Sequence, residues 1–282
     1  MQIKNVLLTG GCGLVGRTLG PLLRDRYTVA HFEMQDPGDG LRFIQGDLRN
    51  PGEVAKACVG MDAVIHVAAL HGKAWAELGD DTGFEVNVTG TKNVLEGAAR
   101  AGVKRVVFTS SIWANGHHAP PAAYLPMDEE MEREPAELYG LTKLLGEQMC
   151  RYSTAQHGIS TIVLRPGGIR PAELHDPRSV ALLTACVDVR DVAQAHALAL
   201  GAPEAMRHEV FIITADSPLS RVDPSAFRAD HVGTLDATCP GAGALVLSGD
   251  LAIGPDAEWY TIEKAKRLLG YRPRYNFGPI DA

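Results

Sequence analysis

Tyr139 and Lys143 stand four residues apart in the segment Tyr-Gly-Leu-Thr-Lys, and Ser111 closes an apolar run earlier in the chain. Four residues are slightly more than one turn of an α-helix, so we expect the phenol and the ammonium on one helix face, about 6 Å apart along the axis. Since a neighbouring cation favours the phenolate, we predict that Lys143 lowers the pKa of Tyr139 towards the range of a proton-transfer group. The pair alone is weak evidence, because such pairs also occur on solvated helix faces.

A glycine-rich turn follows the first apolar run. Residues 3–9 predict a buried strand, a Gly-Gly-Cys-Gly-Leu-Val-Gly segment follows, and residues 17–26 have helical spacing. Strand, glycine turn and helix in this order are the context of a dinucleotide-binding site. Gly10 would allow the tight turn, Gly13 the approach of a pyrophosphate to the helix N-terminus, and Gly16 the close packing of helix on strand.

The second predicted strand, residues 27–33, ends in the carboxylate of Glu33. An acid about 20 residues beyond such a turn binds the adenosine ribose hydroxyls and repels a 2′-phosphate. Residues 34–40 contain no arginine that would receive that phosphate. We therefore predict NAD rather than NADP, the alternative being an ordinary strand-end carboxylate.

Strands and helices alternate up to about Pro166, which predicts an α/β fold with right-handed crossovers: a Rossmann-type doubly wound parallel sheet with a small C-terminal substrate-side lobe. We expect an NAD-binding core with the catalytic helix over residues 1–166, and a mixed region over residues 167–282 that partly completes the sheet and partly binds substrate. The remaining expected elements are strands at 62–67, 103–108, 159–164 and 209–213, helices at 84–100, 137–157 and 261–269, and loops at 119–126 and 128–134.

The chain resembles the extended short-chain dehydrogenase/reductase family, in its NAD-dependent epimerase/dehydratase group, along nearly its whole length. Each matching motif is modest, but their order and spacing are specific. The matching segments are residues 9–16, 46–48, 64–69, 87–95, 106–111, 139–143, 164–166, 189–193 and 264–270.

The resemblance implies roles for single residues. Tyr139 would be the acid/base on the substrate oxygen, Lys143 would bind the nicotinamide ribose, and Ser111 would hydrogen-bond the reacting oxygen. Thr109 and Ser110 are alternatives to Ser111. The cofactor-binding set implied by the family comprises Gly10, Gly13, Leu14, Val15, Gly16, Glu33, Asp47, Leu48, Ala68, Ala69, Tyr139, Lys143 and Pro166.

Several of these positions also have structural interpretations. Asp47 follows a short strand-like run and would suit a turn, and the Ala68–Ala69 pair would suit close backbone packing. Asn87 is expected to serve a hydrogen-bond network, and His66 to be a core histidine.

The substrate is less defined. Residues 167–186 form a short segment with only two arginines, Arg170 and Arg178, and no aromatic residue. A nucleotide diphosphate needs several cationic or backbone donors, so we expect a free sugar, a sugar acid or a simple hydroxy compound, as in uronate dehydrogenases. His71 is a candidate substrate ligand, and the loop residues His117 and His118 are expected to be solvated. A nucleotide-sugar epimerase or dehydratase, and a non-catalytic NAD-sensing protein, are the alternative functions.

Composition excludes several classes of partner. The net charge of −7 and the pI near 5.8 argue against nucleic acid and anionic membranes. Five scattered cysteines without metal-ligand spacing predict a cytoplasmic protein without a metal site. We also expect a homodimer in which two helices of each subunit form a four-helix bundle. The candidate interface residues are Val88, Val94, Leu95, Ala98, Leu141, Leu144, Leu145 and Met149.

Overall fold

The computed structural model describes residues 2–117, 121–132 and 134–278, so His118 and parts of the two predicted loops lie outside the described residues. The chain divides into two compact units. The first comprises Met1–Ala119, Arg133–Arg165 and Ala193–Phe211, and the second comprises Pro120–Glu132, Pro166–Val192 and Ile212–Ala282.

A seven-stranded sheet has the order β3-β2-β1-β4-β5-β6-β9. Its strands are β1 (Asn5–Thr9), β2 (Thr28–Glu33), β3 (Arg42–Gln45), β4 (Ala63–His66), β5 (Arg105–Thr109), β6 (Ser160–Pro166) and β9 (His208–Ile213). The registered pairs from β3 to β6 are all parallel. The order reverses between β1 and β4, which is where open parallel sheets bind ligands, at the carboxyl ends of the strands. The predicted Rossmann-type fold is confirmed.

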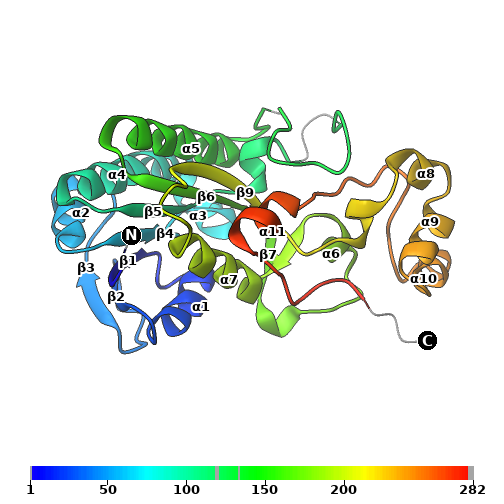
Figure 1. Ribbon diagram of the computed structural model, residues 1–282, viewed down its shortest axis with the longest axis horizontal. Helices are drawn as coiled ribbons and strands as arrows, with labels where there is room; N and C mark the ends of the chain where they lie inside the picture. The colour runs from blue at the N-terminus through cyan, green and yellow to red at the C-terminus, as the bar shows by residue number, and fades with distance from the viewer. Residues whose placement is uncertain (1, 118–120, 133, 279–282) are drawn as a thin grey trace. The chain divides into compact units, whose positions relative to one another are not determined.

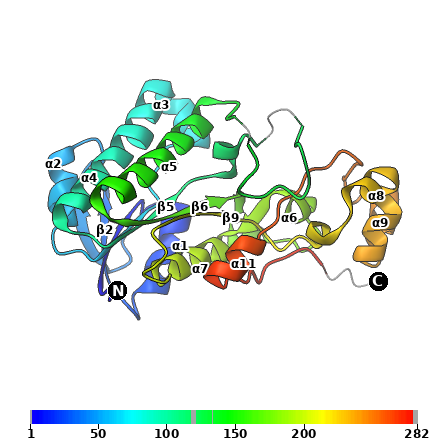
Figure 2. The same cartoon turned by 45° about the horizontal axis from the view of Figure 1, so that its top comes forward.

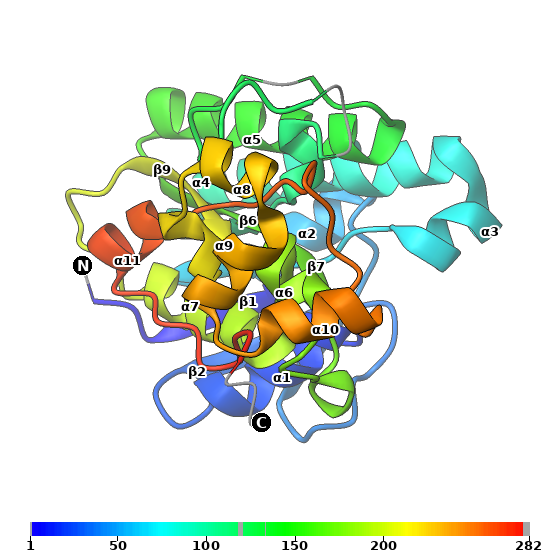
Figure 3. The ribbon, with the colours of Figure 1, turned by 90° about the vertical axis from the view of Figure 1, so that its right-hand side faces the viewer.

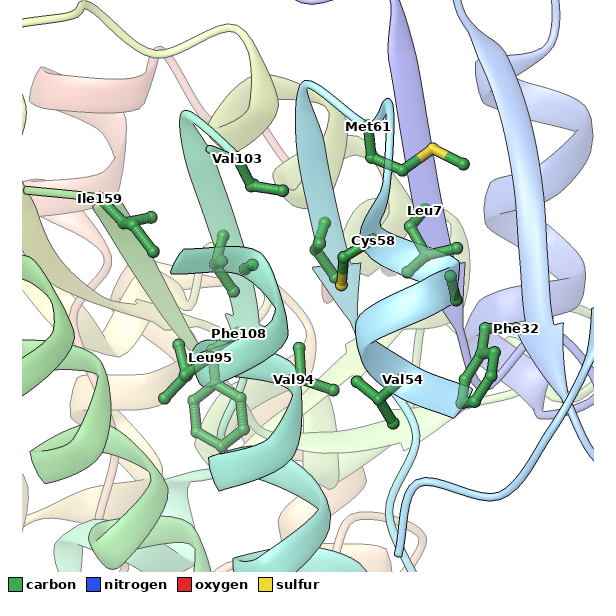
Figure 4. Packing of buried hydrophobic residues seen from close by; sticks show 14 of the residues in the cluster. Leu7, Phe32, Val54, Cys58, Met61, Val94, Leu95, Val103, Phe108 and Ile159 are labelled. Atoms are coloured by element: carbon green, nitrogen blue, oxygen red, sulfur yellow. The ribbon is translucent and has the colours of Figure 1, made fainter. Parts of the chain in front are cut away.

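Helices cover both faces of this sheet. Figures 1 and 2 show α2 (Pro51–Cys58), α4 (Gly90–Ala101) and α5 (Leu138–His157) side by side on one face, and α1 (Leu14–Leu23) on the other with α7 (Val189–Leu200). Strand β1 contributes Leu7 and β5 contributes Phe108 to a buried core beneath α2 and α4 (Figure 4). The strands are apolar on both faces because both faces are covered.

The helix predicted over residues 84–100 is present, but it includes a π-helical turn and is preceded by a helix that was not predicted. The chain forms α3 (Gly72–Phe84), a π-helical turn (Glu85–Thr89) and then α4. The backbone of Gly79, at φ 83°, bends α3 into two pieces. Most side chains of α3 are exposed, so it lacks the apolar stripe by which a surface helix is recognised in a sequence.

The second unit has its own core around Leu219, Phe227 and Trp259. It contains a parallel pair of short strands, β7 (Gly168–Arg170) and β8 (Cys186–Asp188), and the helices α6 (Val180–Thr184), α8 (Pro224–Ala229), α9 (His231–Thr238), α10 (Ala242–Ser248) and α11 (Glu263–Leu269). Helix α11 was predicted. Helices α8 to α10 are absent from the predicted elements, because segments of six to eight residues are too short to show helical periodicity.

Candidate active and cofactor site

The glycine turn is shaped by close backbone contacts in the first unit. Gly10 has φ 80°, and a Cβ there would lie 2.6 Å from the backbone nitrogen of Ala68. A Cβ on Gly16 would collide with the carbonyl oxygen of Gly10. Both positions therefore require glycine, one for the turn against the β4 loop and the other for packing α1 on the turn.

Gly13 is the N-cap of α1 and gives it no side-chain cap. A Cβ on Gly13 would meet only the Gly10 carbonyl oxygen, at 3.4 Å, so the space above this glycine is open. Leu14 and Val15 are the first residues of α1; Leu14 is exposed and the Val15 side chain is buried. What these two residues can offer a ligand is mainly their backbone N–H groups, and free N–H groups at a helix N-terminus suit a phosphate.

Glu33 ends β2 beside this turn. Its Oε1 accepts from the backbone N–H of Cys12 at 3.5 Å, and its Oε2 accepts from the N–H of Met34 at 2.9 Å. Arg17, which no sequence motif marks as part of the site, donates from its Nε to the carbonyl oxygen of Cys12 at 2.8 Å. A carboxylate and a guanidinium therefore flank the same turn residue.

Asp47 is held by Arg49. The Asp47 Oδ2 accepts from Arg49 Nη2 at 2.6 Å and from its Nε at 3.0 Å, and Asp47 Oδ1 accepts from the Arg49 backbone N–H at 2.9 Å. These bonds lower the pKa of Asp47. The side chain thus closes a turn, the alternative interpretation of this residue, and stays ionised. Its neighbour Leu48 is buried, and the Leu48 carbonyl accepts from Asn93.

A hydrogen-bond chain links β1, β4 and α4 through His66. The backbone N–H of Ala68 donates to Thr9 Oγ1 at 3.3 Å, and Thr9 Oγ1 lies 2.7 Å from His66 Nδ1. His66 Nε2 lies 3.0 Å from Thr91 Oγ1, which donates to the Asn87 carbonyl at 2.6 Å. Burial lowers the pKa of His66 to about 3, so this is a satisfied, neutral core histidine, as expected. Ala69 is half-buried in the same loop.

Asn87 extends this chain to α5. Its Oδ1 accepts from the Leu70 N–H at 2.7 Å and its Nδ2 donates to the Leu70 carbonyl at 2.9 Å. The same Nδ2 lies 3.2 Å from Thr142 Oγ1, which donates to the Tyr139 carbonyl at 2.7 Å. Asn87 thus ties the loop after β4 to the helix that carries Tyr139, the network role expected for it.

The structure brings Ser111, Tyr139 and Lys143 together in the first unit. Ser111 caps the short helix Ile112–Asn115, and its hydroxyl lies near enough to the Tyr139 phenol to favour the phenolate. Lys143 Nζ lies 5.8 Å from the centroid of the Tyr139 ring and donates to the Thr109 carbonyl at 2.8 Å. Of the three hydroxyls in the segment 109–111, that of Ser111 lies beside Tyr139, whereas Thr109 faces His196 and Ser110 faces Glu147.

Two glycines let α5 approach closely enough for this contact. A Cβ on Gly140 would lie 2.5 Å from the Trp113 carbonyl oxygen, and a Cβ on Gly146 would collide with the Phe108 ring. The Glu137 carboxylate caps the helix by accepting from the N–H groups of Tyr139 and Gly140. The start of α5 is therefore pressed against the residues that follow Ser111.

The prediction that Tyr139 has a lowered pKa is wrong for this structure. Burial raises its pKa to about 12, and the nearby Ser111 hydroxyl offsets this only in part. Burial also lowers the pKa of Lys143 to about 8, against the opposing effect of Glu147. Helical spacing gave the correct neighbours, but desolvation is the largest influence on the pKa of each group.

Two aromatic side chains lie beside Tyr139. The ring centroid of His71, a predicted substrate ligand, is 6.1 Å from that of Tyr139. The Trp75 ring, which belongs to no predicted motif, stands edge-on to Tyr139, with 6.2 Å between the ring centroids. Pro166, the remaining predicted cofactor ligand, is the last residue of β6.

Among the described residues, no group of histidine, cysteine and acidic side chains is arranged to hold a metal ion. No described helix is both long and apolar enough to cross a membrane.

Comparison with known proteins identifies the family. The model of the NAD dependent epimerase/dehydratase family matches residues 6–171. A short-chain dehydrogenase/reductase superfamily protein from Agrobacterium tumefaciens with bound NAD is 26% identical, with a TM-score of 0.73 over 96% of this chain and 93% of that one. A mutated uronate dehydrogenase shares the fold, at a TM-score of 0.69 and 22% identity, over 98% of this chain and 83% of that one.

Two named relatives act on different classes of compound. A 3β-hydroxysteroid dehydrogenase/Δ5→4-isomerase of Mycobacterium tuberculosis is 32% identical over 60% of this chain and 48% of its own length. An L-arabinose 1-dehydrogenase (NAD(P)+) of Haloferax volcanii is 29% identical over 61% of this chain and 69% of its own length. The chain thus matches only about half of the steroid enzyme.

Proposed function

The chain belongs to the NAD dependent epimerase/dehydratase family, and we propose that it is an NAD-dependent oxidoreductase that oxidises a small sugar, sugar acid or other hydroxy compound. The observation that carries this proposal is that Ser111 and Lys143 both lie beside the Tyr139 phenol, with the Lys143 Nζ 5.8 Å from the centre of the Tyr139 ring. These are the groups that proton transfer at a substrate hydroxyl requires.

The residues around the glycine turn fit NAD. The open space above Gly13 and the uncapped N-terminus of α1 suit a pyrophosphate, and the Glu33 carboxylate suits the two hydroxyls of a ribose. Lys143 and Tyr139 would hold the nicotinamide ribose. Asp47, Leu48, Ala68, Ala69 and Pro166 are proposed as the remaining contacts. When bound, the cofactor supplies the hydride acceptor.

The chain's own residues handle the proton. Ser111 would hold the substrate oxygen by a hydrogen bond, and Tyr139 would take the proton from the substrate hydroxyl as the carbon–hydrogen bond breaks. Because the pKa of Tyr139 is about 12 in the unliganded protein, the phenol is protonated at neutral pH. A positive charge near the phenol is therefore needed to favour the base form, and the Lys143 ammonium is the nearest described candidate.

The small size of the substrate is inferred from the second unit. Residues 167–186 contribute only Arg170 and Arg178 as cations, too few for a nucleotide diphosphate. The similarity to an L-arabinose dehydrogenase points the same way. We propose that the second unit supplies the substrate-binding lobe.

The second candidate is a nucleotide-sugar 4-epimerase or dehydratase with tightly bound NAD, which the family description favours. The two candidates differ in whether NADH leaves the enzyme. Incubation with NAD and D-glucuronate, D-galacturonate, L-arabinose or UDP-glucose, followed by NADH absorbance, separates them. Net NADH from a free sugar supports the dehydrogenase, whereas a converted UDP-sugar without NADH release contradicts it.

A cytoplasmic location and a homodimer are parts of the same proposal. All five cysteines are unpaired, as in a reducing compartment. On α5, Leu141 and Tyr152 are exposed. On α4, by contrast, Val94, Leu95 and Ala98 are buried in the core between the helices and the sheet. The interface would therefore use the outer face of α5. Light scattering should give twice the chain mass of 30.2 kDa, and a monomer at micromolar concentration would exclude the dimer.

A further inference from the structure

The first turns of helix α3 are largely exposed. From residue 71 to residue 81 every side chain is exposed except that of Trp75, which is half-buried. Gly72 and Gly79 have φ angles of 53° and 83°, so positive-φ glycines lie at both ends of the turns that carry Trp75. Figure 3 shows α3 as an outlying element, bent into two pieces.

Trp75 is held in one orientation. Its Nε1–H donates to Asp80 Oδ1 at 2.8 Å. The bend at Gly79 brings Gly83 against the six-membered ring, where a Cβ would lie 2.5 Å from it. On another side the ring meets Tyr139, at an interplanar angle of 83°. An aromatic ring fixed by a hydrogen bond, a glycine and a tyrosine, yet still half-exposed, is preorganised for a ligand.

The second ring beside Tyr139 belongs to His71, the residue that directly precedes α3. It is the N-cap residue of α3, its side chain makes no capping bond, and its ring is 6.1 Å from that of Tyr139. Atoms packed around part of the ring and the nearby Lys143 lower the pKa of His71, although more than a third of the residue remains exposed. The neutral ring has one donor and one acceptor nitrogen, which is the pairing that a hydroxyl group requires.

We propose that Trp75 and His71 form the substrate-recognition wall beside Tyr139, and that the wall binds a sugar ring, with its C–H face on the indole and a ring hydroxyl on the imidazole. The π-face of an indole is negative and attracts the weakly positive C–H groups of a pyranose. This inference rests on the proposed function, and it names the substrate class of the same site.

A sugar fits this wall better than a steroid does. A four-ring apolar nucleus needs a continuous apolar lining, whereas the polar groups nearest this part of α3 are the Asp80 carboxylate at the indole N–H and the imidazole of His71. A single fixed aromatic ring beside a polar imidazole matches a compact ligand with one apolar face and several hydroxyls.

The test compares two substitutions that both remove the indole N–H. Trp75→Phe keeps an aromatic ring and Trp75→Leu does not. With D-glucuronate, D-galacturonate or L-arabinose as substrate, KM should rise roughly 10-fold or more in Trp75→Leu and only about 2-fold in Trp75→Phe, since a lost stacking contact is worth about 1.4 kcal/mol. Neither should change NAD affinity. Leu78→Ala, on the exposed face of the same helix, is the matched control and should leave KM unchanged.

Equal KM values for the Phe and Leu variants would overturn the stacking role, and so would an equal effect of Leu78→Ala. Wild-type enzyme that oxidises none of the three carbohydrates overturns the sugar assignment. A 3β-hydroxysteroid serves as the comparison substrate. If NADH forms only from the steroid, the enzyme transfers hydride but its substrate is not a sugar. If NAD binds and no compound of the panel yields NADH, the result contradicts the proposed function itself.

Discussion

Removing the buried charge of Lys143 should make the protein more stable and less active. In the folded chain the pKa of Lys143 falls from 10.5 to about 8 because the group is buried. At about 1.4 kcal/mol for each tenfold change, the protonated lysine costs the folded state about 3 kcal/mol at neutral pH. Lys143→Met keeps the apolar stem and loses the hydrogen bond to the Thr109 carbonyl, worth about 1 kcal/mol. The net expectation is a gain of about 2 kcal/mol.

The pH dependence gives this prediction its sign. The unfolded chain binds the Lys143 proton more tightly than the folded chain does, so the cost is fully present below the folded pKa of about 8 and disappears as the pH rises towards 10.5. The advantage of Lys143→Met should therefore be largest at about pH 7 and nearly absent at about pH 10.

Urea unfolding, followed by circular dichroism and by tryptophan fluorescence, measures the free energy of unfolding of the variant and the wild type at each of the two pH values. Two probes are needed, because a chain with two compact units need not unfold in one step. Lys73→Met is the control, since the Lys73 side chain is 88% exposed, and it should leave stability unchanged. A Lys143→Met variant that is less stable than wild type at about pH 7, or an advantage of equal size at both pH values, would refute the reasoning.

Three further predictions concern the candidate site. Tyr139→Phe should cut turnover by roughly 10²–10⁴ and leave NAD affinity nearly intact; near wild-type steady-state rates would remove Tyr139 from the chemistry. Glu33→Ala should weaken NAD binding by about 10-fold and narrow the preference over NADP, because Arg17 remains at the turn; calorimetry that finds tighter NADP than NAD binding to the wild type would contradict this. Gly140→Ala should lower turnover and destabilise by about 1–3 kcal/mol, because its Cβ meets the Trp113 carbonyl. The control, Gly254→Ala, adds a Cβ with nothing within 4 Å and should be silent in both assays.

The sequence by itself determined the framework of the site. The glycine turn, the carboxylate of Glu33 and the spacing of Tyr139 and Lys143 are local patterns, and local patterns specify backbone conformation directly. A strand followed by glycines and a helix has few other solutions, and four residues on a helix always share a face. For the same reason the alternation of strands and helices sufficed to predict the parallel sheet.

Tertiary structure decided the contacts and the charges. Three adjacent hydroxyls, at residues 109 to 111, follow β5, and only the packing of α5 shows that Ser111 is the one that reaches Tyr139. The sign of the Tyr139 pKa shift depends on burial, which no spacing in the sequence reveals. The ring contact between Trp75 and Tyr139 joins residues 64 positions apart in the chain, so no local pattern reveals it. Periodicity records the interactions of a segment with its own neighbours along the chain, whereas desolvation and ring contacts arise between segments that meet only when the chain folds.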